Sequence, residues 1–379
     1  MKKFFYAGAF LLVLFEIANV YFIMPLPGSQ DVNSIDLAYF LYSNRWIIRI
    51  ALGLAMLSGV ISAFKGSKWL TGFVLLLMVA VSYMVRYEMA ADTMFYEPRT
   101  MHMAFAPDNV VADERIVIGV ALKDEARAYP IQYIGYHHKV FDTIAGKPIM
   151  VTYCTVCRSG RVFEPLINGK EEKFRLVGMD HFNAMFEDYT TKSWWRQVTG
   201  EAIAGPLKGQ MLPEVPTLQT SLATWLELYP NSLVMQPDSN YQTIYDGMSD
   251  YEAGHREGEL TRRDSLSWKD KSWIAGVVVH GLAKAYDWNE LLRNDIIMDK
   301  LGDYPIAVMV TNDAKSLFAF MRNSDTQQLS FRNDTLTDGM IDYTLLGKAV
   351  DTTGQDLIPI PVYQEYWHSW RTFHPQTTR

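Results

Sequence analysis

Two cysteines stand three positions apart in the segment VTYCTVCRSGRVF (151–163), and they are the only two in the chain: Cys154 and Cys157. This spacing suits three different roles. In an oxidising compartment the pair could form a disulfide, which would be easily reduced because it closes a small, strained loop. Two thiolates on one turn could instead hold part of a soft-metal site. Two small buried residues need no chemistry at all.

Residues near the cysteine pair exclude one further role and indicate partners for the thiols. Arg158 stands where c-type haem attachment requires a histidine, so haem attachment is excluded. Thiolates need a positive partner near neutral pH, which either Arg158 or a metal ion would supply. His137 and His138 precede the pair on an expected strand, 133–140, so only one of them can face the cysteines. Copper and zinc are the candidate ions.

A second group of residues predicts a ligand cleft. The segment TTKSWWRQVTGEAIAGPLKG (190–209) interleaves polar side chains with tryptophan, and polar groups in such a pattern could line a cleft. The candidate cleft residues are Arg158, His181, Ser193, Trp194 and Gln197. The chain has no phosphate-binding glycine loop, Gly-x-Ser-x-Gly elbow or His-Glu-x-x-His motif, so we assign no catalytic residue and leave enzymatic activity open.

The first 90 residues predict three transmembrane helices. Apolar runs at 4–23 and 47–64 match the length needed to span a bilayer, and a third run at 70–85 is slightly short. Glu16 and Asn19 interrupt the first run and no small-residue cleavage site follows, which favours a spanning helix over a signal peptide. The flanking lysines predict a cytoplasmic N-terminus, with the domain after the helices outside, in a periplasm or its equivalent.

Two features of these helices predict packing contacts. A small residue recurs at every fourth position of the second run, at Ala51, Ala55, Gly59 and Ala63. Such a stripe allows a neighbouring helix, of this chain or of a partner membrane protein, to approach closely. Glu16 is costly inside a span unless it is paired. Arg49 is its candidate partner, and the alternative is that the Arg49 side chain only extends to the membrane surface.

Self-comparison predicts an internal duplication. With a shift of 157 residues, GVALKDEARAY at Gly119 aligns with GVVVHGLAKAY at Gly276, and PIMVTYC at Pro148 aligns with PIAVMVT at Pro305. The expected divisions are a membrane region, 1–90, a connector, 91–115, repeat 1 with both cysteines, 116–234, a polar connection, 235–272, and repeat 2 without cysteines, 273–379.

The pattern of each repeat predicts a strand-rich α+β fold. Each repeat opens with hairpin signals and closes with a Trp-rich amphipathic segment, 218–230 or 363–375, that predicts a helix ending before proline. The second repeat has the turn signal Asn312-Asp313 where the first has its cysteines. We therefore expect Cys154 and Cys157 on a tight turn between strands.

The chain resembles the bacterial domain-of-unknown-function family 3179. The residues that carry the resemblance are RAYPIQYIGYHHKVFDTIAGKPIMVTYCTVC (127–157), TKSWWRQVTGEAIAGPLKGQ (191–210) and FHPQT (373–377). The family pattern has a Trp-His-Glu-like step where this chain has Tyr136-His137-His138, so His137, which matches the family position, is preferred over His138 as the histidine that faces the cysteines. Thr155-Val156 replaces the family's Pro-Leu between the cysteines. The family implies a fold group and these positions, but no reaction.

We therefore expect a protein of the inner membrane whose outer domain binds a soft metal, or cycles thiols, through Cys154, Cys157 and His137. The alternative is a non-catalytic accessory subunit of a larger membrane complex. The lipid bilayer is the expected partner. Nucleic acid is not an expected partner, because the net charge is −7 and no basic tract occurs.

Overall fold

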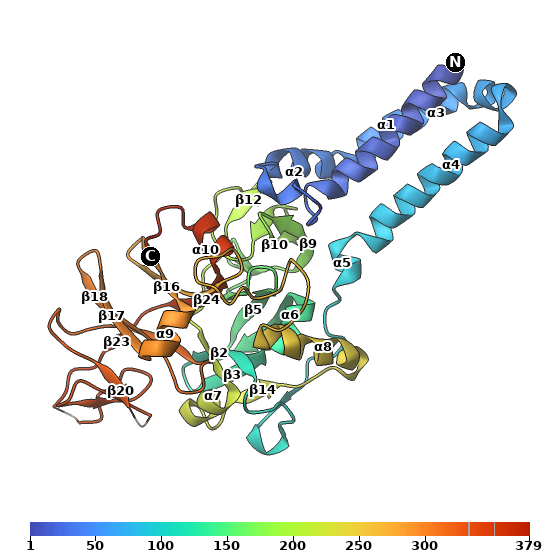
Figure 1. Ribbon diagram of the computed structural model, residues 1–379. Coiled ribbons are helices and arrows are strands. Elements are labelled where there is room, and N and C mark those ends of the chain that lie inside the picture. The colour runs from blue at the N-terminus through green and yellow to red at the C-terminus, as the bar shows by residue number, and fades with distance from the viewer. Residues whose placement is uncertain (333, 352) are drawn as a thin grey trace. The chain divides into compact units, whose positions relative to one another are not determined.

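The computed structural model describes residues 1–332, 334–351 and 353–379. The chain forms two compact units (Figure 1). The first unit contains Met1–Tyr96, Glu172–Arg196 and Glu201–Met211. The second unit contains Glu97–Glu171, Gln197–Gly200 and Leu212–Arg379. Part of the segment assigned to repeat 1 from the sequence thus belongs to the unit that holds the apolar helices.

Three helices of the first unit are long and apolar enough to cross a membrane, as the sequence predicted. They are α1 (Lys2–Tyr21), α3 (Arg45–Gly66) and α4 (Lys68–Tyr83), and α4 continues into a π-helical turn, η2 (Met84–Glu88). Figure 1 shows α1 and α3 side by side. Three short helices complete the helical part: η1 (Ser29–Asp31), α2 (Ile35–Ser43) and α5 (Ala91–Met94).

Contacts between α1 and α3 explain two of the four small residues that recur along α3. A side chain at Gly59 would overlap the backbone of Met1 and Phe5, and Ala63 is fully buried. These two positions therefore pack within the chain instead of facing a partner helix. Glu16 accepts two hydrogen bonds from the Arg49 guanidinium, both at 2.7 Å, so the expected pairing inside the helical region is confirmed.

The first unit also contains an antiparallel sheet of four strands in the order β12-β11-β10-β9. The strands are β9 (Phe174–Asp180), β10 (Asn183–Asp188), β11 (Trp194–Arg196) and β12 (Ala202–Ala204). Trp194 is fully buried in an apolar cluster with Ala38 from α2 and Ile23, which follows α1. The Met179 amide donates to the Ile23 carbonyl at 2.8 Å, so sheet and helices form one packed unit.

The second unit contains two runs of elements in the same order. The first run is β2 (Ile116–Leu122), β3 (Glu125–Pro130), α6 (Ile131–His137), β4 (Lys139–Ile144), β5 (Lys147–Cys154) and β6 (Ser159–Phe163), with β13 (Leu218–Ser221) and α7 (Leu222–Leu228) farther on. The second run is β15 (Trp273–Val279), β16 (Leu282–Asp287), α9 (Trp288–Asn294), β17 (Ile296–Leu301), β18 (Tyr304–Val310) and β19 (Leu317–Met321), with β24 (Val362–Tyr366) and α10 (Trp367–Phe373) farther on.

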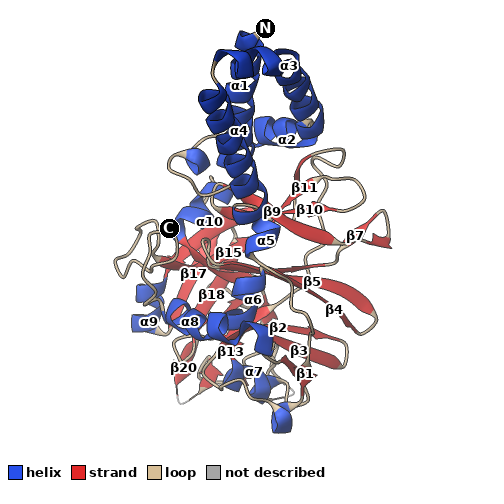
Figure 2. Ribbon diagram, turned by 90° about the vertical axis from the view of Figure 1, so that its right-hand side faces the viewer, coloured by secondary structure: helices blue, strands red, loops and turns tan. Residues whose placement is uncertain are grey.

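Most of the remaining elements of this unit are short. They are β1 (Met103–Ala104), η3 (Ala106–Asp108), β7 (Leu166–Ile167), β8 (Lys170–Glu171), β14 (Leu233–Met235), η4 (Ser239–Tyr241), α8 (Gln242–Ala253), β20 (Ser330–Arg332), β21 (Thr335–Thr337), β22 (Asp342–Tyr343) and β23 (Ile358–Pro359). The largest sheet has the order β1-β14-β3-β2-β13-β19-β18-β17, with β23 paired to β19. Three-stranded sheets have the orders β4-β5-β6, β16-β15-β24 and β20-β21-β22. Figure 2 shows α6 and α8 side by side next to these strands.

Two segments differ from the structure predicted for them. The residues at 133–140 are not a strand: α6 ends at His137, His138 takes a left-handed conformation with φ 62°, and β4 begins only at Lys139. The Trp-rich closing segments begin as strands β13 and β24 before they turn into α7 and α10. In the Trp-rich segments, tertiary strand pairing overrides the helical pattern of the sequence at the first residues.

A glycine opposite a buried tryptophan recurs in the two runs. A side chain at Gly119 in β2 would overlap the ring of Trp225 from α7, and one at Gly276 in β15 would overlap Trp370 from α10. Both tryptophans are fully buried. The two indole rings thus require a strand position without a Cβ.

We predict that Gly119→Ala lowers the free energy of unfolding by about 1–3 kcal/mol, because the added methyl group overpacks the Trp225 site. The matched control is Gly247→Ala in α8, where a Cβ would meet nothing within 4 Å. That variant should be unchanged or slightly more stable, by under about 1 kcal/mol. Denaturant unfolding of the detergent-solubilised protein, followed by tryptophan fluorescence, measures both. Equal stability of the two variants would contradict the packing assigned to Trp225.

Candidate thiol site

The two cysteines lie on the turn between β5 and β6, as the sequence predicted. Cys154 ends β5 and pairs with Ser159, the first residue of β6, so residues 155–158 form the turn. Arg158 closes the turn with φ 54°. Both cysteines are present as thiols and are fully buried. No helix begins at Cys157, which distinguishes this pair from one whose thiolate is stabilised by a helix N-terminus.

The turn is covered by residues more than a hundred positions farther along the chain. The Cys157 carbonyl accepts a hydrogen bond from the Tyr366 amide at 2.9 Å. The Val156 carbonyl accepts one from Lys271 Nζ at 2.7 Å. His368 Nε2 lies 3.0 Å from the same carbonyl oxygen and 3.1 Å from Lys271 Nζ. One backbone carbonyl of the cysteine turn therefore brings an ammonium and an imidazole together.

Backbone contacts hold Lys271 and His368 in place. The first residues of α10 donate to the carbonyls on either side of Lys271: Trp367 to Ser272 and His368 to Asp270, each at 2.9 Å. His368 is thereby fixed against the segment that carries Lys271, and the lysine reaches the turn. Both groups are positioned by backbone hydrogen bonds instead of by mobile side chains.

The charges of this cluster are coupled. Burial lowers the pKa of Lys271 to about 8, and the negative charges of Cys157 and Cys154 oppose that shift. Because the attraction is mutual, a protonated Lys271 favours the thiolate forms of both cysteines. Burial, with Lys271 as a smaller cause, lowers the pKa of His368 to about 3. At neutral pH the cluster therefore has one cation, Lys271, and a neutral imidazole.

Arg158, the cation expected from the sequence, makes other contacts. Its guanidinium lies 3.7 Å from the ring centroid of Trp273 and donates to the Glu252 carbonyl at 3.1 Å. The side chain is fully buried. These contacts tie the turn to α8 and β15, which is a structural role.

A polar pocket of about 690 Å³ reaches Lys271. Its charged lining residues are Glu259, Arg262, Arg263, Asp264, Lys269, Asp270 and Lys271. The four cations exceed the three carboxylates, so the pocket suits a polar or anionic group. Lys271 therefore contacts both this pocket and the cysteine turn.

His137, the histidine predicted to face the cysteines, contacts two tyrosines. It ends α6, is buried, and its Nε2 lies 2.5 Å from the Tyr245 hydroxyl of α8. Its ring also meets that of Tyr241 edge-on at 5.1 Å. Within residues 1–332, 334–351 and 353–379, no group of three His, Cys, Asp or Glu side chains is arranged to hold a metal ion. Copper or zinc at Cys154, Cys157 and His137 remains a prediction.

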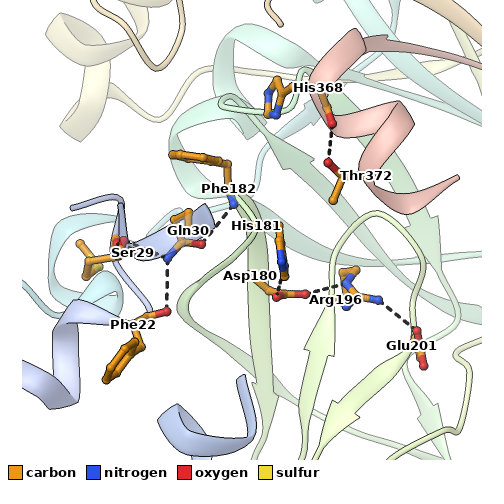
Figure 3. Close-up of polar contacts among 11 residues, drawn as sticks. Phe22, Ser29, Gln30, Asp180, His181, Phe182, Arg196, Glu201, His368 and Thr372 are labelled. Atoms are coloured by element: carbon orange, nitrogen blue, oxygen red, sulfur yellow. Dashed lines mark hydrogen bonds and ion pairs between the residues drawn. The ribbon is translucent and has the colours of Figure 1, made fainter. Parts of the chain in front are cut away.

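The predicted cleft residues of the first unit have structural partners. His181 Nδ1 lies 2.7 Å from Asp180, which also accepts from Arg196, as Figure 3 shows. The hydrogen bond to Asp180 raises the pKa of His181. Ser193 Oγ accepts from the Leu207 amide at 3.0 Å.

The other predicted cleft residues also form hydrogen bonds within the protein. Trp194 Nε1 donates to Glu187 at 3.1 Å. In the second unit, Gln197 accepts from Ser159 Oγ at 2.7 Å and donates to Thr152 at 3.0 Å, so it braces the β5–β6 hairpin next to the cysteines. Arg158 and Gln197 belong to a different unit from His181, Ser193 and Trp194.

Sequence reasoning missed Lys271 and His368. They are 115 and 212 residues from Val156 in the chain, and no motif spacing connects them to the cysteines. The sequence contained two partial indications of these residues. Lys271 stands at the end of the polar connection, and His368 lies within the Trp-rich segment that closes repeat 2.

The fold and the site define a class: strand-rich α+β proteins with candidate membrane-spanning helices and a buried thiol pair. A sequence profile of the family described as "Protein of unknown function (DUF3179)" matches residues 96–377, so the chain belongs to this family and the predicted resemblance is confirmed. Comparisons with curated proteins and with solved structures found no match.

We predict that His368→Gln reduces the loss of stability at acid pH. The folded-state pKa of about 3 lies below the ordinary 6.5. The unfolded chain therefore binds more protons between these values, and the stability that His368 contributes is full above pH 6.5 and lost as the pH falls toward 3. At pH 4.5 this loss is on the order of 2 kcal/mol.

The measurement is the unfolding free energy at pH 7 and pH 4.5. His368→Gln should show a smaller difference between the two than the wild type. The exposed His255 supplies the control, and His255→Gln should retain the wild-type difference. If both variants retain the wild-type difference between pH 7 and pH 4.5, the burial assigned to His368 is wrong.

Proposed function

We propose that this protein is a membrane-anchored thiol–disulfide exchange protein, with Cys154 and Cys157 as its reactive pair. The observation that carries the proposal is the position of Lys271, whose ammonium donates into the cysteine turn and attracts both thiolates. Thiolates, not thiols, carry out exchange, so a fixed cation beside the pair favours this chemistry.

The exchange requires a disulfide as co-reactant. One cysteine thiolate attacks a sulfur of the substrate disulfide, and the other substrate sulfur leaves as a thiolate. The second cysteine thiolate then attacks the first cysteine, closes the Cys154–Cys157 bond and releases the remaining substrate thiol. The substrate gains two electrons and the protein pair loses two. Because both cysteines are fully buried, the turn must open for the first step.

Metal binding is the competing proposal, and the site favours it less. A cation already lies at the turn, and its charge would repel Cu(I) or Zn(II). Zinc also takes four ligands, whereas no three-residue donor group occurs in the described part of the chain.

We further infer that the second unit arose by duplication, and that the thiol site belongs to one copy only. Support comes from hydrogen bonds that recur at the shift of 157 residues. Tyr129 donates to Asp142 at 2.7 Å, and Tyr286 donates to Asp299 at 2.9 Å. Repeat 2 covers the turn of repeat 1, since Tyr366 and His368 supply contacts to it.

We infer that the second unit lies outside the cytoplasm, where disulfides persist. Support comes from the flanks of α1, α3 and α4, which carry lysines at one end of the helices and arginines at the other. Alkaline phosphatase fused after Arg379 should therefore be active in cells, because it folds only outside. A cytoplasmic reporter at the same position should be inactive. The reverse result would contradict the orientation and make a disulfide in the resting protein improbable.

We predict that Lys271→Met raises the pH at which Cys154 and Cys157 react with iodoacetamide at half the maximal rate by about one unit, because the thiolates lose their cation. The readout is the pH profile of alkylation, measured by peptide mass. A change in turn opening would alter the plateau rate, whereas a change in thiolate stability moves the midpoint.

Two variants control this experiment. Lys271→Arg keeps the cation and should restore the midpoint. Lys269→Met removes a cation from the same pocket and should leave the midpoint unchanged. A midpoint that is the same in Lys271→Met and Lys269→Met would rule out Lys271 as the thiolate partner.

A further inference from the structure

The first unit contains a cavity of about 620 Å³ where the apolar helices meet the β9–β12 sheet. Its lining comes from the end of α1, the start of α3, the segment after α4 and two strands of the sheet. All three candidate spans therefore end at this cavity. Lipid head groups lie at the ends of membrane spans, and the tyrosines in the lining, such as Tyr42 and Tyr87, are typical of that depth.

The cavity carries an excess of positive charge. Five cations line it, against two carboxylates, Asp92 and Glu187. Arg175 forms an ion pair with each of these carboxylates, with nitrogen–oxygen distances of 2.9 Å. Arg49 is occupied by Glu16.

Three cations of the lining remain for a ligand. In the described chain, Arg45, Arg86 and Lys192 form no ion pair with a carboxylate and lie instead near tyrosine rings. Their positive charge is therefore available to an anion that enters the cavity.

One buried polar group also lacks a partner. Asn19, in the last turn of α1, is 8% exposed and lines the cavity. Its Oδ1 is buried and has no hydrogen-bond partner among the described residues. A buried acceptor of this kind is costly unless a donor reaches it. The cavity therefore offers cations for an anion and an acceptor for a hydroxyl or ammonium donor.

We propose that this cavity binds the head group of an anionic phospholipid that carries a hydroxyl donor, such as phosphatidylglycerol. The lipid phosphate lies among Arg45, Arg86 and Lys192, and a head-group hydroxyl donates to Asn19 Oδ1. Basic pockets at the ends of transmembrane helices are suited to such head groups. The site joins the anchor and the sheet of the first unit through a lipid. It is independent of the thiol chemistry proposed above.

The test uses the full-length protein in nanodiscs, with bound lipid identified by mass spectrometry. Wild-type protein should retain phosphatidylglycerol over phosphatidylcholine by about tenfold or more, which corresponds to about 1.4 kcal/mol. Arg86→Gln with Lys192→Gln should remove that preference. The control is Lys65→Gln with Lys68→Gln, which removes two exposed cations at the other ends of α3 and α4. Equal loss in both double variants would overturn the proposal, because general surface charge would then explain retention.

Two further arms identify the ligand. Phosphatidylmethanol has the same charge as phosphatidylglycerol but no head-group hydroxyl. Wild-type protein should prefer phosphatidylglycerol, and Asn19→Leu should bind both equally. Inorganic phosphate or glycerol phosphate, added to detergent-solubilised protein, should bind at least tenfold more weakly than the lipid. A soluble phosphate that displaces the lipid completely would overturn the lipid assignment in favour of a free anion.

Discussion

The thiol site depends on how the protein supplies hydrogen-bond donors to the buried turn between β5 and β6. The Val156 carbonyl, in the turn that carries both cysteines, is contacted by Lys271 and His368, and an unpaired carbonyl there would be costly. Lys271 fills that need with a charged donor, although burial alone disfavours the ammonium and lowers its pKa. The negative charge of the cysteines offsets part of this penalty. The lysine, the carbonyl and the thiols therefore stabilise one another.

This arrangement explains why the second run of elements matters although it has no cysteines. It supplies β24 and α10, whose backbone amides hold the Cys157 carbonyl and the segment around Lys271. Arg158 and Gln197 brace the hairpin from other directions, through Trp273 and Ser159. The cysteine turn is thus held on several sides by fixed groups. A turn held in this way opens rarely, which would limit exchange to partners that bind and open it.

The sequence predicted local features well and distant contacts poorly. The three long apolar helices, the β5–β6 turn and the Glu16–Arg49 pair follow from hydropathy, turn residues and the cost of a lone charge among apolar residues. The strand predicted at 133–140 was wrong, because the apolar pattern of this segment did not reveal the left-handed His138 that separates α6 from β4. Lys271 and His368 could not be predicted, since their role comes from side-chain contacts with a carbonyl more than a hundred residues away in the chain.

The most direct test of the thiol proposal is a redox titration of the full-length protein. It would be equilibrated in glutathione buffers from reducing to oxidising, alkylated, and analysed by mass spectrometry with metal content measured in parallel. The proposal predicts two forms, a dithiol that carries two alkyl groups and a Cys154–Cys157 disulfide that carries none, which interconvert with a two-electron dependence on potential. Two thiols that stay reduced in every buffer would contradict it. One copper or zinc ion per chain, lost in Cys154→Ser, would contradict it equally.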